Sequence, residues 1–280
     1  MSYSVLAAVG SGALVGFILG LLGGGGSILA TPLLLYAVGV TSPHVAIGTG
    51  ALAVSINAMA GFLLHALKGH VWWRCSLVFA GIGAIGALAG SGLGKAIDGR
   101  ALLVFFGLLM LVVGALMLRP KKGTEDQRLT DRTLIGQGPT NLRSADLRPV
   151  DLPMCLRTAA VALLAGFASG FFGIGGGFLV VPALIFATGM PTLNAVGTSL
   201  LPVAAFGLAT AVNYSISGLV DWPLAAMFIG GGFFGGAAGM LLARRLARYK
   251  GLLDRLFAAL VFLVAIYILY QSAPAISALN

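Results

Sequence analysis

The sequence predicts an all-α, polytopic membrane protein made of two homologous repeats of about five helical segments each. Hydrophobic residues fill 59% of its 280 positions and charged residues only 9%, whereas soluble domains carry about 25% charged residues. The apolar runs are continuous and reach the roughly 20 residues that a helix needs to cross a bilayer. Because polar and apolar residues do not alternate within these runs, they do not fit a β-barrel.

The apolar runs place five helical segments in each half of the chain. We expect helices at residues 3–22, 26–39, 43–66, 71–94 and 101–118, and again at 156–172, 175–189, 193–217, 221–243 and 253–271. The second segment of each half is short and begins in a glycine run. This predicts a glycine-rich broken or re-entrant helix in each half. It leaves open whether the short segments cross the membrane completely.

A glycine run followed by a proline occurs twice, at a constant offset of 149–150 residues. Gly23–Gly26, with Pro32 downstream, is matched by Gly173–Gly177, with Pro182 downstream. The match extends well beyond the glycines. Ala46–Leu52 matches Ala195–Leu201, Gly69–Trp73 matches Gly218–Trp222, and Gly81, Gly83, Gly86 and Gly90 match Gly230, Gly232, Gly235 and Gly239. We therefore interpret the two halves of the chain as duplicated copies of one unit.

Residues 119–156 differ from both halves, since they hold many charged and few large apolar residues. We interpret them as a solvated linker between a first transmembrane repeat, 1–118, and a second, 157–280. Basic loops of membrane proteins lie on the cytoplasmic side, which places the linker and the Arg244–Arg255 cluster in the cytoplasm. Five crossings per half then invert the second repeat and put both termini outside. The expected location is the plasma membrane, which is the inner membrane of a bacterium, as a multi-pass protein.

The paired helix breaks predict a binding site. A helix that starts inside the bilayer carries unpaired N–H groups and about half a positive charge at its N-terminus, and glycine lets a ligand approach the main chain closely. Two such ends that meet near the midplane favour an anion. The eight acidic residues agree with this, since all of them lie in predicted loops or at span ends. The alternative is simple helix packing, for which membrane helices also use glycine.

The candidate substrate-binding residues lie in the two breaks and in the Gly-Thr motifs that follow them. Hydroxyl groups can donate hydrogen bonds to an anion, although Ser and Thr also bond to carbonyls of their own helix. The primary candidates are Gly24, Gly25, Gly26, Ser27, Thr49, Gly175, Gly176, Gly177, Thr198 and Ser199. The secondary candidates, whose polar groups need partners inside a span, are Asn57, His65, Asn213 and Tyr214.

Enzymatic, metal-binding and nucleic-acid functions find little support. Two cysteines give neither a disulfide framework nor metal-ligand spacing, and the basic residues lie in short loops between spans. A His-Glu-x-x-His motif and a nucleotide-binding loop are missing from the sequence. Ser91 and Ser169 lie beside glycines but lack the Gly-x-Ser-Gly spacing of an intramembrane serine protease. We therefore expect no catalytic residue, no metal and no cofactor.

Both glycine-rich elements, together with Gly48-Thr49 and Gly197-Thr198-Ser199 downstream, resemble the sulfite exporter TauE/SafE family, also called the TSUP family. The resemblance covers residues 5–118 and 157–271 but not the linker. It implies a plasma-membrane carrier for small sulfur-containing anions such as sulfite, sulfonates or thiosulfate. Export is the direction that it implies. The second run departs from the first by carrying Ile174 in place of a glycine.

We therefore expect a secondary transporter that works by alternating access around the two helix breaks. Its expected partners are a small anionic substrate and the lipid bilayer, with no nucleic acid. A passive anion channel and a non-transporting membrane scaffold for a sulfur-metabolism enzyme remain as alternatives. The sequence leaves open which anion is carried, which ion is coupled to it, and whether the chain forms a homo-oligomer.

Overall fold

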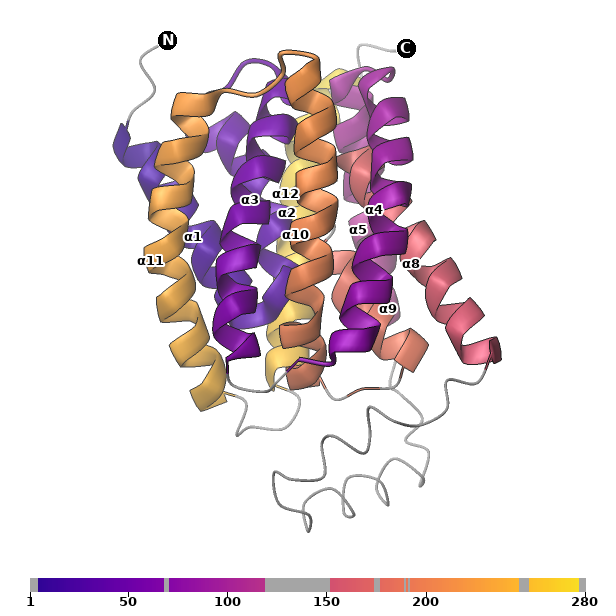
Figure 1. Cartoon of the computed structure of the whole chain (residues 1–280). Coiled ribbons are helices and arrows are strands. Elements are labelled where there is room, and N and C mark those ends of the chain that lie inside the picture. Colours follow the sequence, from indigo (N-terminus) through magenta and orange to yellow (C-terminus); the bar gives the residue numbers. More distant parts are fainter. Residues whose placement is uncertain are drawn as a thin grey trace.

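Figure 1 shows the computed structural model of the chain, which describes residues 5–67, 71–118, 152–173, 177–188, 190, 192–246 and 252–276. All regular structure in these residues is helical, which confirms the all-α fold class. The first repeat holds α1 (Val5–Leu22), η1 (Gly23–Gly26), α2 (Ser27–Pro32), η2 (Leu33–Ala37), α3 (Pro43–Ala66), α4 (Trp73–Lys95) and α5 (Gly99–Leu118). The second repeat holds α8 (Leu152–Phe172), α9 (Gly177–Thr188), α10 (Thr192–Ile216), α11 (Trp222–Leu246) and α12 (Leu252–Ile276).

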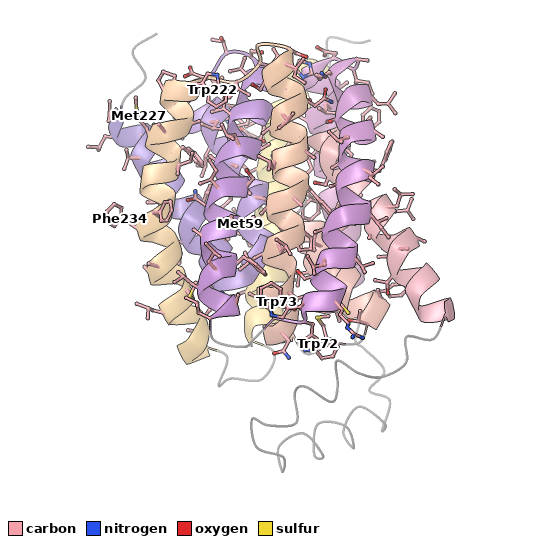
Figure 2. All side chains as sticks on the ribbon, in the orientation of Figure 1. Met59, Trp72, Trp73, Trp222, Met227 and Phe234 are labelled. Atoms are coloured by element: carbon pink, nitrogen blue, oxygen red, sulfur yellow. The ribbon has the colours of Figure 1, made fainter. Side chains whose placement is uncertain are left out.

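Several helices are long and apolar enough to cross a membrane. Within the described residues, five stretches meet this condition by length and composition, namely Val5–Ala37, Pro43–Ala66, Trp73–Lys95, Asn194–Ile216 and Trp222–Ala243. Large apolar side chains also cover the outside of the bundle. Leu6 is 87% exposed and Phe234 is 83% exposed, and Figure 2 shows Phe234 pointing away from the helices. A surface of this kind suits lipid rather than water, so the chain is a helical membrane protein.

The bundle has two ends, which we name by the chain segments that reach them. α1 begins and α12 ends at one end, called here the terminal end, whereas α3 ends and α4 and α8 begin at the other, called here the linker end (Figure 1). Trp73 and Trp222 occupy equivalent positions in the two repeats. Figure 2 shows Trp222 at the terminal end and Trp73 at the linker end. An inverted repeat requires this placement of equivalent residues at opposite ends.

Helices of one repeat pack on helices of the other. α1 packs along α11 and α8 along α4, while the third helices, α3 and α10, and the fifth helices, α5 and α12, pack on each other. Glycines at every fourth position permit the closest of these contacts, because a Cβ built on them would overlap the main chain of the partner helix. These positions are Gly12, Gly16 and Gly20 of α1, against α11, and Gly86, Gly90 and Gly94 of α4, against α8.

The first helix of each repeat ends where its glycine run begins. α1 ends at Leu22 and Gly23 has a φ of +69°, while α8 ends at Phe172 and Gly173 has a φ of +65°. Glycine adopts positive φ without strain, so these two residues turn the chain out of the first helix. The chain then continues as the 3₁₀ turn η1 in the first repeat. In the second repeat, residues 174–176 lie outside the described part of the chain.

Prolines mark the segments that follow the breaks. α2 ends at Pro32, which lacks an N–H group and so leaves the carbonyl of Ile28 without its regular helical partner. The chain passes into the wider turn η2, where the N–H of Val38 donates to the carbonyl of Leu33 at 3.0 Å. In the second repeat Pro182 lies inside α9. α8 begins at Leu152 and not at 156, and proline in the first helical turn, here Pro153, favours such an early start.

Candidate functional site

The two glycine runs contact each other, main chain against main chain. A Cβ built on Gly24 would overlap the carbonyl of Gly177, and one built on Gly177 would overlap the carbonyl of Gly24. Gly24, Gly25 and Gly26 are all buried, and a Cβ on Gly26 would overlap the main chain of α1. The structure thus brings the two predicted tracts together with no room for a methyl group between them. Gly175 and Gly176 lie outside the described residues.

The four predicted hydroxyl residues are buried, and each is hydrogen-bonded to the protein. Ser27 Oγ donates to the carbonyl of Gly24 at 2.8 Å, and Ser199 Oγ donates to the carbonyl of Val196 at 2.8 Å. Each of these hydrogen bonds joins a serine hydroxyl to the carbonyl three residues earlier in the chain, as Ser commonly does in helices.

The two threonines make reciprocal bonds between the repeats. Thr49 Oγ1 accepts a hydrogen bond from the N–H of Asp221 at 3.0 Å, and Thr198 Oγ1 accepts one from the N–H of Trp72 at 3.1 Å. Asp221 and Trp72 immediately precede α11 and α4, whose first N–H groups have no partner within the helix. Each threonine therefore fixes the start of the fourth helix of the opposite repeat.

We expect Thr198→Val to lower the free energy of unfolding by about 1–2 kcal/mol, because it removes the acceptor of a part-buried N–H group. Thr49→Val should cost a similar amount, since its bond is the counterpart in the other repeat. Thermal unfolding in detergent measures both. Thr210→Val is the matched control, because the buried Thr210 hydroxyl has no partner among the described residues. If Thr210→Val lowered the free energy of unfolding as much as Thr198→Val does, the role assigned to the Thr198 hydrogen bond would be contradicted.

A cavity of about 330 Å³ lies between α1, α3 and α11, and α10 contributes Leu200 to its wall. It extends from Asn57 and Gly232, in the middle of their helices, to His65, in the last turn of α3 at the linker end. Phe233 also lines it and is 52% exposed, so the cavity reaches the surface of the bundle. Its lining is mostly apolar and includes Leu19, Leu63, Leu64, Leu200, Phe233 and Met240.

Asn57 and His65 supply the polar side chains of this cavity, two helical turns apart on the same face of α3. Asn57 is 6% exposed, and neither its Oδ1 nor its Nδ2 has a hydrogen-bond partner in the part of the chain that the structure describes. A Cβ on Gly232 would overlap the Asn57 amide, so the glycine makes room for it. His65 Nδ1 lies 3.1 Å from the carbonyl oxygen of Gly61, in position to donate to it.

An aromatic ring fills the equivalent space in the other repeat. Phe206 stands at the position that corresponds to Asn57, and it is completely buried. A Cβ on Gly83, the counterpart of Gly232, would overlap the Phe206 ring. Phe79 stacks on this ring at 6.4 Å between centroids. The cavity near Asn57 is therefore replaced by packed aromatic side chains near Phe206.

A polar network joins α4 to α10 at the terminal end. Lys95 Nζ donates to the carbonyl of Asn213 at 3.0 Å, to its Oδ1 at 2.8 Å and to Ser217 Oγ at 2.8 Å. Asn213 Nδ2 in turn donates to Ser91 Oγ at 2.6 Å. Lys95 Nζ also lies 5.9 Å from the centroid of the buried Tyr214 ring. These contacts hold α4 and α10 together at the terminal end of the bundle.

The structure separates the four secondary candidates into two pairs. It places Asn57 and His65 in the cavity, and Asn213 and Tyr214 beside Lys95. Sequence reasoning missed Phe206 and Lys95. The alignment of the two repeats held a signal for the first, because it sets a phenylalanine opposite Asn57. Within the described residues, His, Cys, Asp and Glu side chains form no group of three or more that could hold a metal ion.

Comparison with known proteins agrees with these features. The family model for the sulfite exporter TauE/SafE matches residues 8–268. A probable membrane transporter protein of Xylella fastidiosa is 55% identical over 269 residues, which cover 96% of this chain and 96% of that protein. The probable membrane transporter protein YunE of Bacillus subtilis is 29% identical over 258 residues, which cover 88% of this chain and 90% of that protein. No solved structure matches the chain significantly. The chain therefore belongs to the sulfite exporter TauE/SafE family of membrane transporters.

Proposed function

We propose that this chain is a secondary transporter that exports small sulfur-containing anions, such as sulfite, sulfonates or thiosulfate, across the plasma membrane. One observation carries the proposal. A cavity extends from Asn57 at mid-bundle toward His65 at the linker end, whereas Phe206 fills the equivalent space in the second repeat. A passive channel needs a continuous pore, while a carrier exposes its site to one side at a time. Access from one end therefore favours a carrier.

The distribution of charge supports an anion as the substrate. No carboxylate lines the cavity among the described residues. In the sequence, basic residues stand at the linker-end limits of two helices that line the cavity, since Arg244 and Arg245 belong to the last turn of α11 and Lys68 comes two residues after the end of α3. Such a field raises the local concentration of anions at the entrance.

The helix breaks lie at the inner end of the same route. Leu200 lines the cavity, and its neighbour Ser199 lies against Gly23, where α1 breaks. A small rocking motion of one repeat against the other would separate Gly24 from Gly177 and present main-chain N–H groups of the breaks to an anion. In this proposal the glycine runs, Ser27 and Ser199 meet the anion, while Thr49 and Thr198 hold the starts of α11 and α4 beside the route.

The proposed orientation also supports export. With the linker in the cytoplasm and both termini outside, the cavity lies in the cytoplasmic half of the bundle, on the side where an exporter loads its substrate. The membrane potential then drives an anion outward by about 2.3 kcal/mol per charge per 100 mV. No coupling ion is required for this direction of transport.

A thermal-shift screen of the purified protein tests the proposal. Sulfite, thiosulfate, sulfoacetate, taurine and sulfate are each added at equal ionic strength, with sodium chloride as the control. A ligand at about 100 times its dissociation constant stabilises the folded protein by about 2.7 kcal/mol, so at least one sulfur anion should raise the unfolding temperature above that in chloride. Equal shifts for all salts would contradict an anion site.

A further inference from the structure

We propose that Asn57 is the polar anchor of a ligand site in the cavity between α1, α3 and α11, and that this site takes an organic anion with an apolar body. The inference rests on the proposed function and adds to it a location and a ligand class. The site is separate from the contact between Gly24 and Gly177, because it lies in a space that already exists between helices.

The unpartnered amide of Asn57 points to a ligand. A buried polar group that lacks a hydrogen bond destabilises the folded protein. Both polar atoms of Asn57 are in this state within the described residues, although the side chain is only 6% exposed. A leucine would fill the same space without this cost. A ligand that accepts a hydrogen bond from Nδ2 explains why an amide stands at the inner end of the cavity.

The size and lining of the cavity point to a ligand with an apolar body. A volume of about 330 Å³ falls within the range of roughly 300–1,000 Å³ that small-molecule sites occupy. Its wall is built from Leu19, Leu64, Leu200 and Met240 with glycines between them. Apolar side chains cannot replace the water around a small, strongly hydrated anion. They do favour the binding of a ligand that buries methylene groups against them.

The polar groups suit an anionic head at the inner end. Asn57 Nδ2 has two N–H donors that no group in the described residues accepts, and it lies at the inner end of the cavity. His65 lies two turns away toward the linker end, and no carboxylate lines the space among the described residues. The head would therefore bind at mid-bundle, with the apolar body extending toward the linker end.

The asymmetry between the repeats limits this site to one side. Phe206 takes the place of Asn57 in the second repeat and fills the corresponding space. The protein would thus bind an organic anion only beside Asn57, in the linker half of the bundle. The counterpart space would not bind the same ligand.

A series of alkanesulfonates tests the site by calorimetry or thermal shift on the purified protein. The probes are sulfite, methanesulfonate, butanesulfonate and hexanesulfonate, with 1-hexanol as a neutral probe of the same length. We expect affinity to rise about fourfold per methylene and 1-hexanol to bind at least tenfold more weakly than hexanesulfonate. Equal binding of hexanesulfonate and 1-hexanol would show apolar partitioning alone and would overturn the site.

Asn57→Leu is the decisive variant. It should weaken hexanesulfonate binding at least tenfold and, without ligand, raise the unfolding temperature, because it removes an unpartnered amide. Ser55→Ala is the matched control, since Ser55 is buried on the same helix but donates to the carbonyl of Leu52 at 2.8 Å and does not line the cavity. The Ser55→Ala variant should bind hexanesulfonate with the same affinity as the wild type.

Ala237→Phe provides a second variant, because Ala237 lines the cavity from an exposed position where a larger side chain is tolerated. The larger side chain should abolish the rise in affinity with the length of the alkyl chain of the sulfonate. The variant leaves Asn57 in place. Transport of sulfur anions that is unchanged in both variants would overturn this site while leaving the proposed function intact. Hexanesulfonate binding that depends on Asn57 without any transport would support the site and reject the function.

Discussion

Gly24→Ala and Gly177→Ala are each expected to destabilise the protein by about 3 kcal/mol or more. A methyl group at either position would overlap the main-chain carbonyl of the other glycine. Main chain cannot move aside as a flexible side chain can, and both residues are buried between helices. Fluorescence-detected size-exclusion chromatography after heating measures the effect as a large drop in the unfolding temperature.

Gly81→Ala and Gly230→Ala are the matched controls for this experiment. The two glycines hold equivalent positions in the repeats, lie within helices and have nothing within 4 Å of an added Cβ. Alanine is the better helix former, so each control should gain about 0.5–1 kcal/mol. A Gly24→Ala variant as stable as Gly81→Ala would contradict the contact between the two helix breaks.

Phe206→Ala is expected to open a second cavity in the bundle, beside Gly83 of α4. The substitution removes a completely buried ring that stacks on Phe79, which should cost about 3–5 kcal/mol. It also empties the space that corresponds to the Asn57 cavity. With a cavity in each of the two repeats, the variant should let small anions leak through liposome membranes, in contrast to the wild type.

Phe106→Ala separates the leak from general destabilisation. Phe106 is 2% exposed and packs with Phe178 in a different cluster, between α5, α9 and α12. This control should lose a similar amount of stability, and its liposomes should stay as tight as those of the wild type. A leak of equal size in both variants would reject Phe206 as the side chain that closes the route through the second repeat.

Most of the architecture could be predicted from the sequence because it follows from local and periodic patterns. Apolar runs gave the helices, and the glycine runs gave the ends of α1 and α8, where Gly23 and Gly173 take positive φ. The end of each helix was accurate to a few residues. The largest differences were the end of α12, at 276 instead of 271, and the start of α8, at 152 instead of 156, in residues that their mixed composition had assigned to the linker.

The partners of the candidate residues could not be predicted, because they belong to the other repeat. Thr49 and Thr198 bond to N–H groups more than a hundred residues away, and no local pattern specifies such a pairing. The glycine runs illustrate a second limit. Close helix packing and exposure of N–H groups to an anion require the same residue type, so the contact between Gly24 and Gly177 emerged only from the structure.

Counterflow in proteoliposomes tests the central claim, a carrier with access from one end at a time, most directly. Vesicles are loaded with an excess of the sulfur anion selected by thermal shift, and a trace of the radiolabelled anion is added outside. A carrier predicts transient accumulation of label above the outside concentration, with an initial rate that saturates. Uptake that rises linearly with concentration and never overshoots, or uptake equal to that of empty liposomes, would contradict the account.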